Sequence, residues 1–233
     1  MVSSVIKHGF LILLLLFLFG VFYFTMEELD IMYDTFAKRY YLLNGLEDTA
    51  SMNLVTGIYL DYRLFDSIFE AGILLIAVSG IIWISKHDIE EHNVHFMLDK
   101  FKTPDLFVMF ARVVYPLMLV FGFYIIVNGH LSPGGGFQGG AIVATAILIL
   151  YYIDPNKDTS TSFILSIEKI VFIIIVVFAM LSIFTKGTMF TNPFTSSDAG
   201  VQTIYLVLMN VLIGVKVALG LWAIFTAFLR EGR

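Results

Sequence analysis

The feature that most constrains this chain is a series of long apolar runs. A helix needs roughly 20 apolar residues to cross the hydrocarbon core of a bilayer, which is about 30 Å thick. Six runs approach that length, at residues 10–25, 64–85, 106–127, 137–153, 163–184 and 201–229. Only 14% of the residues are charged, against about 25% in soluble proteins. The sequence therefore predicts an all-α integral membrane protein of about six transmembrane helices.

The first run has an alternative reading. It is shorter than the others and follows Lys7 and His8, as the apolar part of a cleaved signal peptide would. No small-x-small cleavage motif follows Phe24. We therefore expect the run to be a spanning helix.

The distribution of lysine and arginine predicts the orientation in the membrane. With six spans both termini share one side, and the side richer in these residues is normally cytoplasmic. The terminal side carries Lys7, Lys86, Lys100, Lys102, Lys157, Arg230 and Arg233, whereas the opposite side carries Lys38, Arg39 and Lys186. We expect a multi-pass protein of the cell membrane with both termini in the cytoplasm.

A polar stretch at residues 86–104 divides the chain. Its apolar residues, Val94, Met97, Leu98 and Phe101, have the spacing of an amphipathic helix, and Pro104 ends the pattern. The predicted organisation is a two-helix membrane segment at 1–85, an amphipathic linker at 86–104 and a four-helix domain at 105–233.

Several chemistries are excluded or disfavoured by composition. The net charge of −5 offers no basic patch for nucleic acid. The chain has no cysteine, which excludes disulfides, thiolate metal sites and iron–sulfur ligation by its own residues. The linker histidines, His87, His92 and His95, lack the H-E-x-x-H spacing and are expected to be solvated rather than to bind metal.

The stretch "GHLSPGGGFQGG" at residues 129–140 interrupts the apolar pattern. Gly134, Gly136 and Gly139 match G-x-G-x-x-G, the dinucleotide-binding pattern, but a membrane helix rather than a strand precedes them. The favoured interpretation is a helical hairpin whose glycines let another helix pack closely. Its predicted residues are Pro133, Gly134, Gly135, Gly136, Phe137, Gly139 and Gly140.

This stretch carries a family resemblance. "GHLSPGGGFQGGAIVATAILIL" resembles the glycine-rich hairpin of the B subunit of Mrp (also Mnh) multisubunit sodium/proton antiporters, and "NVLIGVKVALGLWAIF" resembles the last helix of the same family. The resemblance covers about residues 106–229. Residues 53–81 resemble the C-terminal end of the Mrp A subunit and the small E subunit of archaeal membrane-bound hydrogenases. The presence of both segments in one chain resembles the arrangement in redox-driven complexes more than that in free-standing Mrp antiporters.

Charged residues inside the apolar runs are the candidate ion-pathway residues, because charges at membrane depth are costly and normally face protein or water. Arg63, Asp66 and Glu70 are spaced to share one helix face. Asp66 could simply pair with Arg63. Glu70 lies deeper, and we interpret it as an exchange site for H⁺ or Na⁺.

Lys216 lies near the middle of the last run and needs a carboxylate partner or must lose its proton. A proton relay and a structural ion pair are both open interpretations. The resemblance adds Glu168, at a position where the third helix of the B-subunit family often carries a glutamate. Lys169 and Arg112 are expected to be anchors near helix ends, and His130 is a further pathway candidate.

Two hypotheses follow. In the first, the chain lines part of an Na⁺ or H⁺ path within a Mrp-like module, with other antiporter subunits, lipid and hydrogenase-like redox subunits as partners. In the second, it is a structural scaffold of a free-standing Mrp antiporter. In both hypotheses the chain has no catalytic activity and no cofactor of its own, because Na⁺ and H⁺ are the transported ions.

Overall fold

The computed structural model describes residues 2–29, 36–88, 104–153, 161–187, 190–194 and 198–231. Every regular element among them is a helix, which confirms the predicted all-α class. Four described helices are long and apolar enough to cross a membrane, and two shorter apolar helices occupy Ile12–Phe24 and Gly136–Tyr151. Most of the predicted linker, with His92 and His95, lies outside the described residues.

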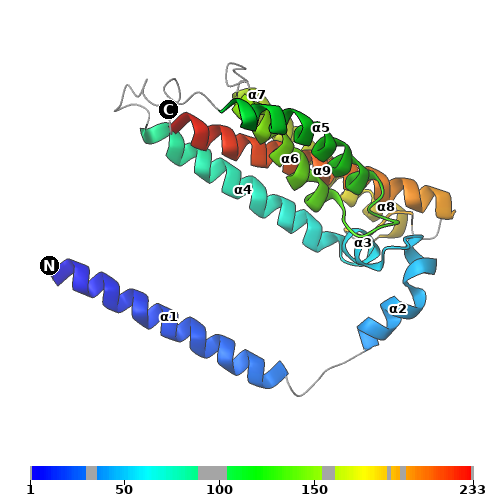
Figure 1. Cartoon of the computed structure of the whole chain (residues 1–233). Coiled ribbons are helices and arrows are strands. Elements are labelled where there is room, and N and C mark those ends of the chain that lie inside the picture. Colours follow the sequence, from blue (N-terminus) through cyan, green and yellow to red (C-terminus); the bar gives the residue numbers. More distant parts are fainter. Residues whose placement is uncertain are drawn as a thin grey trace. The chain divides into compact units, whose positions relative to one another are not determined.

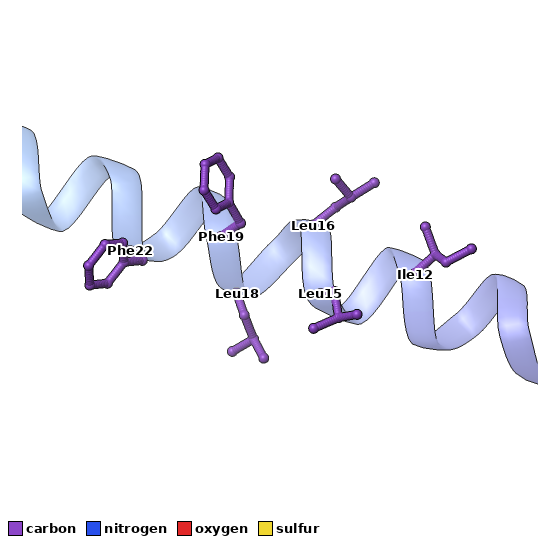
Figure 2. Close-up of a pocket in the computed structure, with 6 residues that line it drawn as sticks. All are labelled: Ile12, Leu15, Leu16, Leu18, Phe19 and Phe22. Atoms are coloured by element: carbon purple, nitrogen blue, oxygen red, sulfur yellow. The ribbon is translucent and has the colours of Figure 1, made fainter.

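The chain divides into two compact units, residues 1–42 and 43–233. The first unit contains α1 (Val2–Leu29), whose side chains from Ile12 to Phe24 are almost all exposed. Figure 2 shows six of them projecting from several sides of the helix. A helix that is apolar all round belongs in lipid or among other helices, so α1 has the character of a membrane helix.

The second unit is a bundle organised around α9 (Ala199–Glu231), which is the most buried of the four long helices. It packs against α4 (Leu64–Asp88), α5 (Asp105–Val127), α6 (Gly136–Ile153) and α7 (Thr161–Met180) (Figure 1). In turn, α5 packs closely on α6, and α4 also contacts α7. Because α9 has neighbours on several sides, its polar side chains are buried by protein rather than by lipid.

Short elements precede α4 at one end of the bundle. They are α2 (Phe36–Thr49), which crosses the boundary between the units, α3 (Leu54–Gly57) and the π-helix η1 (Ile58–Tyr62). Arg63 follows η1 with φ −126° and ψ 36°, so α4 begins one residue later, at Leu64. The expectation that Arg63 lies on the helix with Asp66 and Glu70 is therefore wrong.

The fifth apolar run forms the candidate span Ser162–Thr185. It consists of α7, which ends at Met180, and the short helix α8 (Ser182–Lys186), which follows Leu181. Leu181 keeps helical backbone angles, with φ −57° and ψ −26°, so the turn tightens there without interrupting the span. Gly187 closes α8 in the left-handed conformation, with φ 69°, which glycine adopts without steric cost.

Candidate functional site

The centre of the bundle contains an ion pair between α7 and α9. Glu168 Oε1 lies 3.3 Å from Lys216 Nζ, and both side chains are fully buried. Gly220, one helical turn beyond Lys216, makes room for the carboxylate, because a Cβ atom there would lie 3.0 Å from Glu168 Oε1. The structure thus supplies the carboxylate that Lys216 requires.

Apolar layers enclose this ion pair on both sides along the helices. On α7, Ile164 lies one turn before Glu168 and belongs to one hydrophobic cluster, whereas Val171 lies one turn after it and belongs to another. Neither charged group has a hydrogen bond to any other side chain or backbone group in the described part of the chain. Each charge is therefore stabilised chiefly by the other, in surroundings where unpaired charge is very costly.

The glycine-rich hairpin forms a second polar centre, between α5 and α6. Asn53 Nδ2 lies 2.8 Å from the carbonyl oxygens of both Gly129 and Ser132. The hydroxyl of Thr56 donates to the Gly129 carbonyl at 2.6 Å. The backbone N–H of Asn53 donates to the His130 carbonyl at 2.9 Å. The segment before α4 therefore binds the hairpin backbone directly.

Asn210 of α9 connects this centre to the bundle. Its side-chain oxygen accepts hydrogen bonds from the Tyr59 hydroxyl and from the Gly136 N–H, both at 2.9 Å. The Gly136 bond caps the first turn of α6, where backbone N–H groups lack helical partners. Burial raises the pKa of Tyr59, although hydrogen bonds with Thr56, Gly136 and Asn210 partly offset this effect. The Tyr59 hydroxyl therefore stays protonated near neutral pH and donates to Asn210.

The predicted hairpin glycines lie at close helix contacts. A Cβ atom at Gly136 would lie 2.5 Å from the Asn210 carbonyl, and one at Gly140 would lie 2.6 Å from the Gly214 carbonyl. Gly139 faces α5, where a Cβ atom would lie 2.8 Å from the Gly122 carbonyl. A backbone carbonyl cannot move aside as a flexible side chain can, so these positions exclude larger residues.

The remaining hairpin residues have distinct positions. Gly134 has φ 124°, which disfavours residues other than glycine, and a Cβ atom at Gly135 would collide with the Tyr59 hydroxyl. Phe137 packs against the larger hydrophobic cluster, whereas Pro133 is exposed. His130 is buried, and its Nδ1 has no hydrogen-bond partner in the described residues.

The charged residues near the start of α4 lie apart from the buried ion pair. Arg63 and Asp66 form an exposed ion pair at 2.5 Å. Glu70 is also exposed on α4. On α4 the side chain of Val78, eight residues further along the helix, lies beside Gly220, where the Glu168 carboxylate also lies. The structure therefore pairs Glu168 with Lys216 and Arg63 with Asp66. Glu70 follows Asp66 by one turn of α4, and neither Glu70 nor His130 belongs to the buried pair.

Sequence reasoning missed two groups of polar residues. Asp61 is buried in η1 and accepts a 2.9 Å hydrogen bond from the Asn192 amide. Asn53 and Asn210 bind the hairpin as described above. Asparagine in an apolar run is a signal of a buried polar contact, but only the packing of the helices shows which group it contacts.

Comparison with known proteins gives this arrangement a family context. A family model described as a domain related to the MnhB subunit of Na⁺/H⁺ antiporter matches residues 106–223. This match confirms the resemblance first seen in the hairpin and last helix.

Curated relatives match over shorter segments. An uncharacterized protein of Methanocaldococcus jannaschii is 29% identical over 114 residues, which are 42% of this chain and 42% of that protein. The putative antiporter subunit mnhB2 of Staphylococcus saprophyticus is 32% identical over 95 residues, 40% of this chain and 64% of the relative. The B subunit of a Na⁺/H⁺ antiporter of Bacillus subtilis is 44% identical over 50 residues, 21% and 35% of the two chains. The chain thus spans about half the length of the curated relatives it matches.

Two solved structures share the fold. A chain of the membrane-bound sulfane sulfur reductase, an archaeal respiratory membrane complex, matches with TM-score 0.69 and 23% identity, covering 94% of this chain and 97% of that one. A chain of the Mrp complex from Dietzia sp. matches with TM-score 0.54 and 23% identity, covering 81% of this chain and 23% of that one. Both structures are of membrane complexes, which agrees with an integral membrane subunit.

Proposed function

The chain belongs to the family of domains related to the MnhB subunit of Na⁺/H⁺ antiporters, and from this premise we propose that it is a membrane subunit of a multisubunit antiporter module that exchanges Na⁺ for H⁺. The observation that carries the proposal is the fully buried pair of Glu168 and Lys216. Both residues lie within the segment that matches the family model. A purely structural subunit would not need opposite charges in an apolar core, where ion pairs are often no more stable than hydrophobic residues of similar volume.

The pair can hold and release a proton because its two states differ by the position of that proton. With Lys216 protonated and Glu168 ionised, the two charges stabilise each other. Transfer of the proton to the carboxylate leaves two neutral groups, which an apolar core tolerates better than separated charges. A cation that reaches Glu168 repels the Lys216 ammonium and favours release of its proton. Such mutual exclusion is the elementary requirement of cation/proton exchange.

Glu70 supplies the second proposed exchange site. It is exposed on α4 within the span Leu64–Ser85, beside the exposed side chains of Phe69 and Ile73. A carboxylate at this depth requires water or a partner, so we place a neighbouring subunit against this face. Carboxylate oxygens are ligands that hard cations prefer. Because the chain offers a single carboxylate there apart from the paired Asp66, the neighbouring subunit completes any Na⁺ site.

Redox reactions in partner subunits are our proposed driving force. The similarity to the sulfane sulfur reductase chain extends over almost the whole of both chains, whereas the similarity to the Mrp chain covers a small part of that longer chain. This difference in coverage is the observation that favours a respiratory complex over a free-standing antiporter. The test is mass spectrometry of subunits that copurify with the chain. Iron–sulfur or nickel proteins among them would support redox drive, and a set of antiporter subunits alone would contradict it.

The test of the ion pair uses Na⁺-dependent proton movement in inverted membrane vesicles. Lys216→Arg keeps the positive charge, but its guanidinium does not release a proton near neutral pH, so we expect loss of exchange with normal subunit content. Lys38→Arg is the matched control, since Lys38 is exposed on α2, outside the candidate spans. Normal exchange by Lys216→Arg would contradict the relay role. It would favour instead a structural scaffold without an ion path.

A further inference from the structure

The polar and apolar sides of α2 are reversed relative to a surface helix of a soluble protein. Leu42, Leu43 and Leu46 share one side of the helix and are 65%, 74% and 63% exposed. We call these three residues the leucine face. On the other side of α2, Asp48 accepts a 2.5 Å hydrogen bond from the Tyr62 hydroxyl of η1. A surface helix in water normally buries its apolar side, so the leucine face suits an apolar environment outside this chain.

Close packing fixes which side of α2 faces the protein. Gly45 is buried, and a Cβ atom there would collide with the side chain of Leu54. Thr49 is fully buried in the last turn, and a Cβ atom at Gly57 would lie 2.6 Å from its hydroxyl oxygen. Small residues thus bring α2 and α3 together, and the leucine face remains outside this contact.

The residues beside the leucine face are typical of the membrane surface. Arg39, one turn before Leu43, is exposed, and so is the neighbouring Tyr40. Arginine can lay its methylene groups on apolar surface while its guanidinium reaches lipid phosphates, and tyrosine is enriched at the level of the headgroups. Glu47 is exposed at the edge of the leucine face, where its carboxylate can remain in water.

The hairpin defines the depth of α2 in the membrane. It joins the apolar helices α5 and α6, so it lies at the end of both. Two residues beyond α2, the Ser51 hydroxyl donates to the His130 carbonyl of the hairpin at 3.0 Å. Leu46 and Leu43 precede the end of α2 at Thr49 by less than two turns, which is at most about 9 Å along the helix axis. The headgroup region adds about 5–7 Å to each side of the hydrocarbon core, so the leucine face lies within or next to this region.

We propose that α2 is an interfacial helix whose leucine face contacts the lipid bilayer at the boundary between the headgroups and the acyl chains. A lipid surface accommodates the leucines and the guanidinium of Arg39 together, because the phosphates lie directly beside the acyl chains. α2 thereby holds the segment that binds the hairpin at the membrane surface. This inference does not depend on the proposed ion exchange.

The experiment measures the surroundings of the leucine face by spin labelling. Leu43→Cys and Leu46→Cys each provide one cysteine in a chain that has none, and exposed positions accept a nitroxide label without disturbing the packing. The labelled complex is reconstituted into vesicles of phosphatidylcholine and phosphatidylglycerol, and the unmodified complex gives the background from other subunits. Power saturation then compares collisions of the label with oxygen, which dissolves in the bilayer, and with a neutral nickel chelate, which stays in water.

Asp198→Cys is the matched control, because Asp198 is exposed in a polar stretch just before α9. We expect the ratio of oxygen to nickel collisions at Leu43→Cys and Leu46→Cys to exceed the ratio at Asp198→Cys several-fold. Lipids labelled at known depths should place both labels near the phosphates. A ratio no higher than at Asp198→Cys would place the leucine face in water, and few collisions with either reagent would place it under another subunit. Either result, or a depth near the centre of the bilayer, would overturn the proposal.

Discussion

At the residue scale, variants of the buried ion pair distinguish its effect on stability from its effect on transport. Removing one partner of a buried pair leaves an uncompensated charge and costs about 3–5 kcal/mol, whereas replacing both by apolar residues is often neutral. We predict that Lys216→Met lowers the thermal stability of the complex and that Lys216→Met with Glu168→Leu restores it. Neither variant should exchange Na⁺ for H⁺. The measurement is the melting temperature of the purified complex beside transport in vesicles.

Full transport by the double variant would contradict this prediction, because the ion pair would then not be needed for exchange of Na⁺ for H⁺. Lys216 could be identified from sequence as a charge that needs a partner. Glu168 as that partner could not be derived from spacing, because the two residues lie on different helices and only the packing of α7 on α9 brings them to 3.3 Å. Asp61 and Asn192 were not recognised for the same reason.

Glu70 is the exposed residue for which we propose a partner outside this chain. Glu70→Gln keeps the shape and hydrogen-bonding capacity of the side chain but removes its charge, so we predict loss of Na⁺-dependent proton movement with subunit content unchanged. Glu70→Asp should retain part of the activity with an altered pH dependence. Glu47→Gln is the control, since Glu47 is exposed on α2, outside the span that contains Glu70. Normal exchange by Glu70→Gln would show that the carboxylate is structural.

At the element scale, the glycine contacts of α6 lead to a prediction about assembly. Gly140→Ala adds a Cβ atom 2.6 Å from the Gly214 carbonyl, and overpacking of this kind costs typically about 1–3 kcal/mol. We expect less assembled complex, with unchanged affinity for cations in the fraction that assembles. The measurement is quantitative immunoblotting of the complex after native electrophoresis.

Gly80→Ala is the control for this prediction, because a Cβ atom at Gly80 of α4 would have no atom within 4 Å. An effect of Gly80→Ala as large as that of Gly140→Ala would contradict the packing explanation. Normal assembly of Gly140→Ala with altered cation affinity would instead favour an ion-binding loop at the hairpin.

Helices could be predicted from the sequence where hydropathy alone decides. The run at 106–127 became α5 (Asp105–Val127) and the run at 137–153 became α6 (Gly136–Ile153). The short elements α3 and η1 were not predicted, because Thr56 and Tyr59 within them bond to the distant hairpin and to α9. The run at 163–184 became the span Ser162–Thr185, which contains α7 and α8.

At the scale of the whole molecule, both compact units expose apolar helix surfaces. In the first unit α1 exposes its apolar side chains, and in the second α5 is the least buried of the four long helices. Lipid can cover such surfaces, but it does not solvate the exposed carboxylate of Glu70. In the proposed function the family segment supplies the buried ion pair, α4 presents its charged residues to a partner subunit, and transport is a property of the assembly.

Orientation in the membrane is the last property to test, and the absence of cysteine makes the test direct. α5 has 23 residues, so it is about 34 Å long and can cross the bilayer. Residues at its two ends therefore lie on opposite sides of the membrane. The excess of lysine and arginine predicts that its first residue, Asp105, faces the cytoplasm and that Leu131, exposed in the hairpin, faces outward. In intact cells a membrane-impermeant maleimide should therefore label Leu131→Cys, whereas Asp105→Cys should react only after permeabilisation. Asp198→Cys, exposed just before α9, is a second outward position and should behave as Leu131→Cys does. Labelling of Asp105→Cys in intact cells, with both other positions protected, would reverse the orientation and place the hairpin on the cytoplasmic side.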